Sequence, residues 1–156
     1  MKTVIFGAIV AIGLTAGAAE AETPLMVPIH QFIDSFNKGD QKTAAAAFAP
    51  TSLAIIDEVA PHVWVGPDAL RNWAKDLIVN DQSLGFTGEA VALGTSTREV
   101  VSGDRGYVVV PVVYTYKEHG VAIREAAQMT YALQKGSGGW LIAGWTWVGT
   151  TPAAVK

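Results

Sequence analysis

Apolar residues recur every three or four positions in the first half of the chain. One such stripe runs through residues 24–38 and another through 66–78, with a short segment at 40–48 between them. This spacing places apolar side chains on one face of an α-helix. Pro24 suits the start of the first helix and Gly39 suits its end. The first half therefore predicts three helices, of which the second is short.

After Asn80 and Asp81, apolar residues alternate with polar ones, as is typical of β-strands with one buried face. Two short β-type segments come earlier, at 53–57 and 62–65. Four long strands are predicted, with short glycine-containing connections that suit hairpins. They cover residues 86–97, 107–117, 121–134 and 140–148. Helices followed by an antiparallel meander define an α+β protein whose long strands curl around the helices.

The strand predicted at 121–134 indicates which of its faces is buried. Its odd-numbered residues are mostly apolar and its even-numbered ones mostly polar or small, so the odd face is expected to meet the helices. Glu125 falls on this face, which places it inward or at a rim, and an unpaired carboxylate is costly if it is fully buried there. Arg98, Arg105 and Arg124 are its candidate partners, and the sequence does not choose among them.

The last predicted strand carries tryptophan on both of its alternating faces. Trp140 shares one face with Thr146, and Trp145 shares the other with Trp147. A sheet that is apolar on both sides is usually covered on both. The outer face of the sheet is therefore expected to form a homodimer interface.

Residues 1–21 have the features of an export signal. Lys2 precedes an apolar run that ends in Ala19-Glu20-Ala21, a small-x-small triplet of the kind that signal peptidase cleaves. The run is shorter than the roughly 20 residues that span a bilayer. The sequence therefore predicts cleavage after Ala21, no membrane anchor afterwards, and a single domain over residues 22–156. The expected location is the periplasm, with full secretion as the alternative.

Composition excludes several classes of function. A net charge of −3 without any charge run offers no surface for nucleic acid or for an anionic membrane. The chain has no cysteine, so its fold depends on its core rather than on disulfides. Its three histidines are scattered without metal-ligand spacing, and it has neither a phosphate-binding loop nor a dinucleotide motif. The sequence therefore predicts no metal and no cofactor.

Four motifs, in their order and spacing, resemble the nuclear transport factor 2-like superfamily of SnoaL-like proteins and ketosteroid isomerases. They are Phe32-Ile33-Asp34-Ser35-Phe36-Asn37-Lys38-Gly39-Asp40, Phe48-Ala49-Pro50, Val65-Gly66-Pro67-Asp68-Ala69-Leu70-Arg71-Asn72-Trp73 and Trp140-Leu141-Ile142. The resemblance covers nearly all of residues 22–156. It implies a cone-shaped α+β fold with N-terminal helices packed in the concave face of a curved antiparallel meander sheet. This fold hosts enzymes, binding proteins and assembly modules, so it does not imply one function.

The resemblance to ketosteroid isomerases extends to one catalytic position and departs at two others. Asp57 stands where that family has its general base. The family's oxyanion donors are a tyrosine and a protonated aspartate. Their positions here fall on Phe32 and near Met129, or on Gln128 if the register slips by one residue. A base without such donors lacks a large contribution to catalysis, so the resemblance argues against ketosteroid isomerase activity.

Asp57 and His62 are the candidate catalytic residues. A carboxylate in an apolar pocket would have a raised pKa and could act as a base, with His62 as its partner or as a second acid–base group. The alternatives are a strand-end aspartate that bonds nearby backbone and an exposed loop histidine. Residues expected to line the pocket are mostly aromatic. They are Phe32, Trp64, Trp73, Tyr114, Tyr116, Met129, Tyr131 and Thr146.

Three functions remain open from the sequence. The first is an exported protein whose pocket binds a small, largely apolar molecule. The second is an isomerase or lyase that uses Asp57 as general base. The third is a non-catalytic dimeric interaction module whose cone is filled by its own side chains.

Overall fold

The computed structural model describes residues 23–51 and 53–156. The signal peptide predicted at residues 1–21 lies outside the described residues. Within the described part, no helix is long and apolar enough to cross a membrane. The element order is three helices and two short strands, followed by a run of strands.

The helices are α1 (Met26–Lys38), α2 (Gln41–Ala46) and α3 (Ala69–Leu84). The apolar stripe of α1 is buried, and Gly39 ends the helix in the left-handed conformation that glycine adopts without strain. The Asp40 carboxylate caps α2 by accepting a 3.0 Å hydrogen bond from the Thr43 amide. The third helix runs past the predicted end at residue 78 and stops only at Gly85, which is also left-handed.

All strands belong to one sheet with the order β2-β1-β7-β6-β5-β3, with β4 paired to β5 and β8 paired to β6. Their bounds are β1 (Ala54–Ile56), β2 (Val63–Val65), β3 (Phe86–Leu93), β4 (Arg98–Ser102), β5 (Arg105–Glu118), β6 (Val121–Gly136), β7 (Gly139–Gly149) and β8 (Ala153–Ala154). The prediction of an α+β cone is confirmed. Two details of the sheet differ from the prediction. The strand expected at 86–97 ends earlier and is followed by a separate β4, and β1 pairs with β7 in parallel, so the sheet is mixed.

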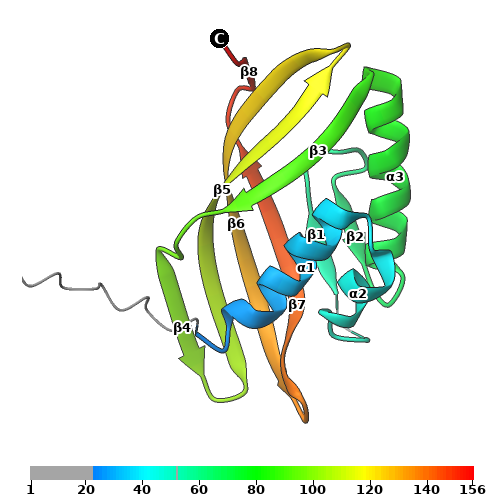
Figure 1. The fold of residues 1–156 in the computed structure, drawn as a ribbon. Helices are drawn as coiled ribbons and strands as arrows, with labels where there is room; N and C mark the ends of the chain where they lie inside the picture. Colours follow the sequence, from blue (N-terminus) through cyan, green and yellow to red (C-terminus); the bar gives the residue numbers. More distant parts are fainter. Residues whose placement is uncertain (1–22, 52) are drawn as a thin grey trace, which may run out of the picture.

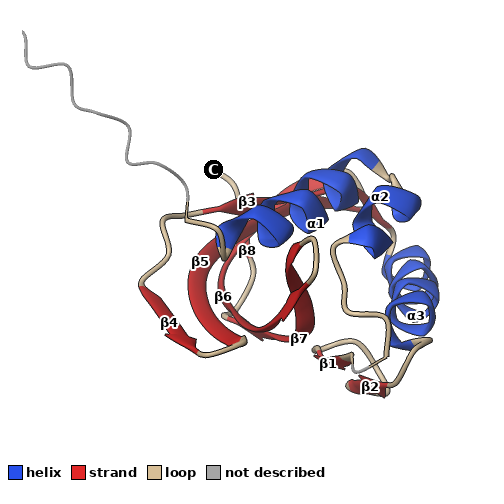
Figure 2. Ribbon diagram, turned by 90° about the horizontal axis from the view of Figure 1, so that it is seen from below, coloured by secondary structure: helices blue, strands red, loops and turns tan. Residues whose placement is uncertain are grey.

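The long strands curl so that the sheet has one concave face, and α1 lies across it (Figure 1). Figure 2 shows the same curl from below, with α3 standing beside β1 and β2 at one side of the sheet. Helix and sheet meet in a single apolar core. Its fully buried large side chains come from α1, β1, β5, β6 and β7, and they are Ile29, Ile55, Val108, Val110, Tyr131, Leu133 and Ile142.

A bulge in β7 settles the ambiguity of its two faces. Gly144 pairs with Ala132 and Ile142 pairs with Leu133, so Ala143 is the extra residue. The extra residue reverses the alternation, and Trp145 and Trp147 therefore pack against the same core as Ile142. The tryptophans thus give no reason for a covered outer face. The homodimer remains a prediction that rests on other residues.

Gly144 lies where β1 approaches β7 most closely. A Cβ at this position would lie 2.9 Å from the backbone oxygen of Ala54, which cannot move without shifting the strand. We expect Gly144→Ala to lower the free energy of unfolding by about 1–3 kcal/mol in a denaturant titration. Gly138→Ala is the control, because nothing lies within 4 Å of its Cβ position. Equal stability of the two variants would contradict the close packing of β1 on β7.

Candidate functional site

A cavity of about 300 Å³ lies between α1, α3 and the concave face of the sheet. This volume is at the lower end of the range typical of small-molecule sites. Eight aromatic side chains contribute to its wall. They are Phe32, Phe36, Trp73, Phe86, Tyr114, Tyr116, Trp145 and Trp147. A wider depression between α2 and α3 shares Phe36 and Trp73 with the cavity, and so adjoins it.

Trp73 organises the inner wall of the cavity. Its ring meets that of Trp145 edge to face, with centroids 5.0 Å apart, and it also contacts Phe32 and Phe36, each at 6.2 Å. Such arrangements are favoured by the ring quadrupole and lock the rings in place. The Trp73 indole donates a 2.7 Å hydrogen bond to Oδ2 of Asp57. The aromatic cluster therefore fixes the orientation of the candidate base.

Asp57 follows β1 directly and lines the cavity. Its Oδ1 also accepts a 3.4 Å hydrogen bond from the backbone amide of Val59. The side chain thus combines both roles considered from the sequence, because it faces the cavity and bonds nearby backbone.

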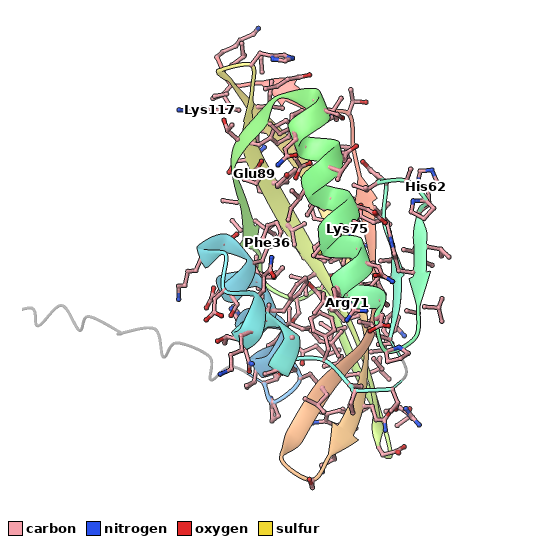
Figure 3. All side chains as sticks on the ribbon, turned by 90° about the vertical axis from the view of Figure 1, so that its right-hand side faces the viewer. Phe36, His62, Arg71, Lys75, Glu89 and Lys117 are labelled. Carbon is pink, nitrogen blue, oxygen red and sulfur yellow. The ribbon has the colours of Figure 1, made fainter. Side chains whose placement is uncertain are left out.

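His62 is exposed at the turn between β1 and β2 and does not line the cavity (Figure 3). Its Nδ1 lies 3.3 Å from the backbone oxygen of Asp57, and its own carbonyl accepts a 3.1 Å hydrogen bond from the Asp57 amide. These contacts involve the backbone of Asp57 rather than its carboxylate. The structure therefore places His62 away from the acid–base position that the sequence suggested for it.

Six of the residues singled out from the sequence line the cavity together. They are Phe32, Asp57, Trp73, Tyr114, Tyr116 and Met129. The structure places three others elsewhere, contrary to the expectation. Trp64 packs beneath α3 and donates a 2.9 Å hydrogen bond to Asp76, and Tyr131 is fully buried with its hydroxyl 3.1 Å from the Met129 sulfur. Thr146 is on the opposite face of β7, because Trp145 and Trp147 on either side of it face the cavity.

Glu125 on β6 lines the cavity although its side chain is only 4% exposed. Its Oε1 has no hydrogen-bond partner among the described residues. The arginines proposed as partners are not placed to reach it. Arg124 is on the other face of β6, while Arg98 and Arg105 pair farther along the sheet, opposite Val109 and Gln134.

Burial raises the pKa of Glu125, and repulsion by the neighbouring Glu58 carboxylate raises it further. A hydrogen bond from Trp147 and one from the backbone of Thr150 act in the opposite direction. The two carboxylates both lie against Gly149, whose amide donates a 3.1 Å hydrogen bond to Glu58 Oε1. The nearby Glu58 carboxylate therefore favours the protonated form of Glu125.

Asp81 completes a set of four carboxyl groups in the cavity wall, with Asp57, Glu58 and Glu125. Burial raises the pKa of Asp81, a hydrogen bond from Asn80 opposes this, and the charges of Glu89 and Asp57 add to the rise. No lysine, arginine or histidine is among the described residues of the wall. The part of the chain that the structure describes also contains no group of three or more His, Cys, Asp or Glu side chains that could hold a metal ion.

Two tyrosines of β5 supply hydroxyl groups to the same wall. Burial raises the pKa of Tyr114 and of Tyr116, and nearby carboxylates raise both further. Both hydroxyls therefore stay protonated and can donate hydrogen bonds. Trp145 adds a further donor, since its indole N–H is buried and has no partner within the described residues.

Sequence reasoning missed Asp81 and Glu58 as site residues, and it left the two tryptophans of β7 undecided between an interface and a ligand platform. Asp81 follows Trp73 and Leu77 at spacings of four, so continuing the stripe of α3 past residue 78 would have found it. Trp145 and Trp147 required knowledge of the bulge. Glu58 is adjacent to Asp57, and no periodic signal indicates which way either side chain points.

The sequence matches no protein-family model and no curated protein. Solved structures do match. A ketosteroid isomerase-like protein from Erwinia carotovora atroseptica is 18% identical over 82% of this chain and 95% of its own, with a TM-score of 0.62. The hexachlorocyclohexane dehydrochlorinase LinA-type3 from Novosphingobium barchaimii is 13% identical over 82% of this chain and 85% of its own, with a TM-score of 0.68.

These likenesses confirm that the chain has the nuclear transport factor 2-like, SnoaL-like cone fold. At identities below 20% they establish the fold alone, so any function has to be argued from the residues of the cavity.

The raised pKa of Glu125 makes stability depend on pH. The folded protein holds this proton above the ordinary glutamate pKa of 4.5, so this group contributes less stability as pH rises past that value. Glu125→Gln imitates the protonated form and removes the penalty. We expect the melting temperature of this variant, relative to the parent, to increase from pH 4.5 toward neutrality in a thermal unfolding series. Glu118→Gln, at an exposed position, is the control for the change in charge. If the difference in melting temperature between Glu125→Gln and the parent did not change with pH, the pKa of Glu125 would not be raised in the folded protein.

Proposed function

We propose that this protein binds a small, largely apolar molecule in the cavity between α1, α3 and the concave face of the sheet. The observation that carries the proposal is the unfilled space of about 300 Å³ with eight aromatic side chains in its wall. Small-molecule sites typically combine such apolar walls with a few polar groups that fix orientation. A cone filled by its own side chains, the alternative from the sequence, would have no cavity of this size.

Export and self-association belong to the same proposal. The export signal in residues 1–21 supports a periplasmic or secreted site of action. The outer face of the sheet supports a homodimer, because it presents small and apolar side chains. These are Val113, Ala126, Ala132 and Val148.

A second candidate function is isomerisation or elimination with Asp57 as the general base. The carboxylate lies in the cavity wall, and Trp73 holds one of its oxygens. The oxyanion-binding positions of ketosteroid isomerases fall on Phe32 and near Met129, which cannot donate, and the alternative Gln128 is exposed and does not line the cavity. However, the cavity offers other donors in the unpartnered Trp145 indole and the two tyrosine hydroxyls. Neighbours named as an isomerase-like protein and a dehydrochlorinase support this candidate at the level of fold.

Binding is tested by thermal shift against a panel of small aromatic and alicyclic compounds. We expect at least one compound to raise the melting temperature in a concentration-dependent manner, since a ligand that binds only the folded state stabilises it. Met129→Trp should abolish the shift, because the larger ring would occupy the cavity from β6. A panel without any shift, or shifts that persist in Met129→Trp, would contradict binding at this site.

Catalysis is tested with Asp57→Asn once a turned-over compound is found. The amide keeps the shape of the carboxylate and an oxygen for the Trp73 hydrogen bond, but it cannot accept a proton from carbon. We expect turnover to fall by roughly 10²- to 10⁴-fold with ligand binding preserved. His62→Asn is the matched control and should retain activity, because His62 lies outside the cavity. Unchanged turnover in Asp57→Asn would exclude Asp57 as the base.

A further inference from the structure

The cavity wall carries acidic groups without any basic group to balance them. Asp57, Glu58, Asp81 and Glu125 all line it, and none of the described lining residues is cationic. Salt bridges of described residues elsewhere are exposed pairs such as Arg71 with Asp68. Arg71 and Lys75 project from the exposed surface of α3 (Figure 3). These two residues and Lys42 line the adjoining depression between α2 and α3, so no cation lies in the described wall of the cavity itself.

Among these acidic residues, Glu125 is the one whose carboxyl group most clearly lacks a partner. The residue is only 4% exposed, it lines the cavity, and its Oε1 accepts no hydrogen bond from any described residue. A buried carboxyl oxygen without a donor costs free energy, so native proteins rarely keep one without a reason. A positive charge held in the cavity beside this carboxyl group would lower that cost through electrostatic attraction.

Aromatic rings surround the same carboxyl group. Tyr114 pairs directly across from Glu125 on the neighbouring strand, and Trp147 donates a hydrogen bond to it. Tyr114 lies 4.9 Å from Tyr116 and 5.9 Å from Trp147, measured between ring centroids, and Phe86 lies 4.2 Å from Tyr116. Rings of this kind attract cations through their quadrupole, and the attraction is strongest where water is excluded.

An organic cation fits this wall better than a metal ion does. The described acidic side chains form no group of three that could hold a metal. A metal ion would also gain little from the apolar rings around Glu125. A substituted ammonium, in contrast, spreads its charge over alkyl groups that can contact the rings while the charge lies close to the Glu125 carboxyl group.

We propose that the cavity takes a small hydrophobic cation, a substituted ammonium whose charged end lies beside Glu125 and against the rings of Tyr114 and Trp147. This inference rests on the proposed binding function and narrows its ligand from a largely apolar molecule to a cationic one. The apolar part of the ligand occupies the inner cavity beside Trp73 and Phe32, and the four carboxyl groups select against anions.

The test compares phenyltrimethylammonium with tert-butylbenzene, its neutral counterpart of the same shape, by isothermal titration calorimetry on the full mature protein. We expect the cation to bind at least about tenfold more tightly, in line with a cation–π contribution in a desolvated site. Glu125→Gln should lower the affinity for the cation about tenfold and leave that for tert-butylbenzene unchanged. Glu118→Gln, which removes the same charge at an exposed position of β5, should change neither affinity.

The outcomes separate the two proposals. If tert-butylbenzene binds as tightly as the cation or more tightly, the proposal of a cationic ligand is wrong, while the proposal that the cavity binds an apolar molecule stands. If neither compound binds and the broader panel also gives no thermal shift, both proposals fail. The comparison of the two ligands on the unmodified protein needs no variant, so it decides the question even if Glu125→Gln does not fold.

Discussion

The parallel pairing of β1 with β7 is the contact on which the candidate site depends. Ile55 pairs with Trp145 and Ala54 pairs with Gly144, where the two backbones approach closely. This pairing attaches an N-terminal strand to the last long strand of the meander, so the residue after β1 enters the cavity wall. Asp57 then meets Trp73 of α3, and one hydrogen bond connects helix, short strand and sheet around the same space.

The cavity exists because the sheet is wider than the helices that cover it. The α1 helix fills the concave face at one end, where Ile29 and Phe32 are buried, and aromatic rings from β3, β5 and β7 line what remains. One of the four carboxyl groups in this wall, that of Glu125, is buried without a counter-charge, which is costly for the isolated protein. This cost is consistent with a wall selected for a ligand rather than for stability, as is common at functional sites.

Much of the fold could be predicted from the sequence, because two strong periodicities and well-placed glycines specify the helices and the long strands. The candidate site could be predicted only in part. Asp57 and Trp73 were accessible through the fold resemblance and the stripe of α3. The orientation of Trp145 and Trp147 depends on a single extra residue in β7, which reverses the alternation and leaves no mark in the periodic pattern. The lack of a partner for Glu125 is a property of three-dimensional packing, since three arginines looked equally suitable along the chain.

The central claim is that Glu125 is a buried carboxyl group for which the protein supplies no counter-charge. The most direct measurement is a pH titration of its side-chain carboxyl carbon by ¹³C NMR in the ligand-free protein, assigned with the help of Glu125→Gln. The account predicts a midpoint clearly above the ordinary value of 4.5, because burial and the Glu58 carboxylate both favour the protonated form. A midpoint at or below 4.5 would contradict it, since it would mean that the protein itself stabilises the negative charge.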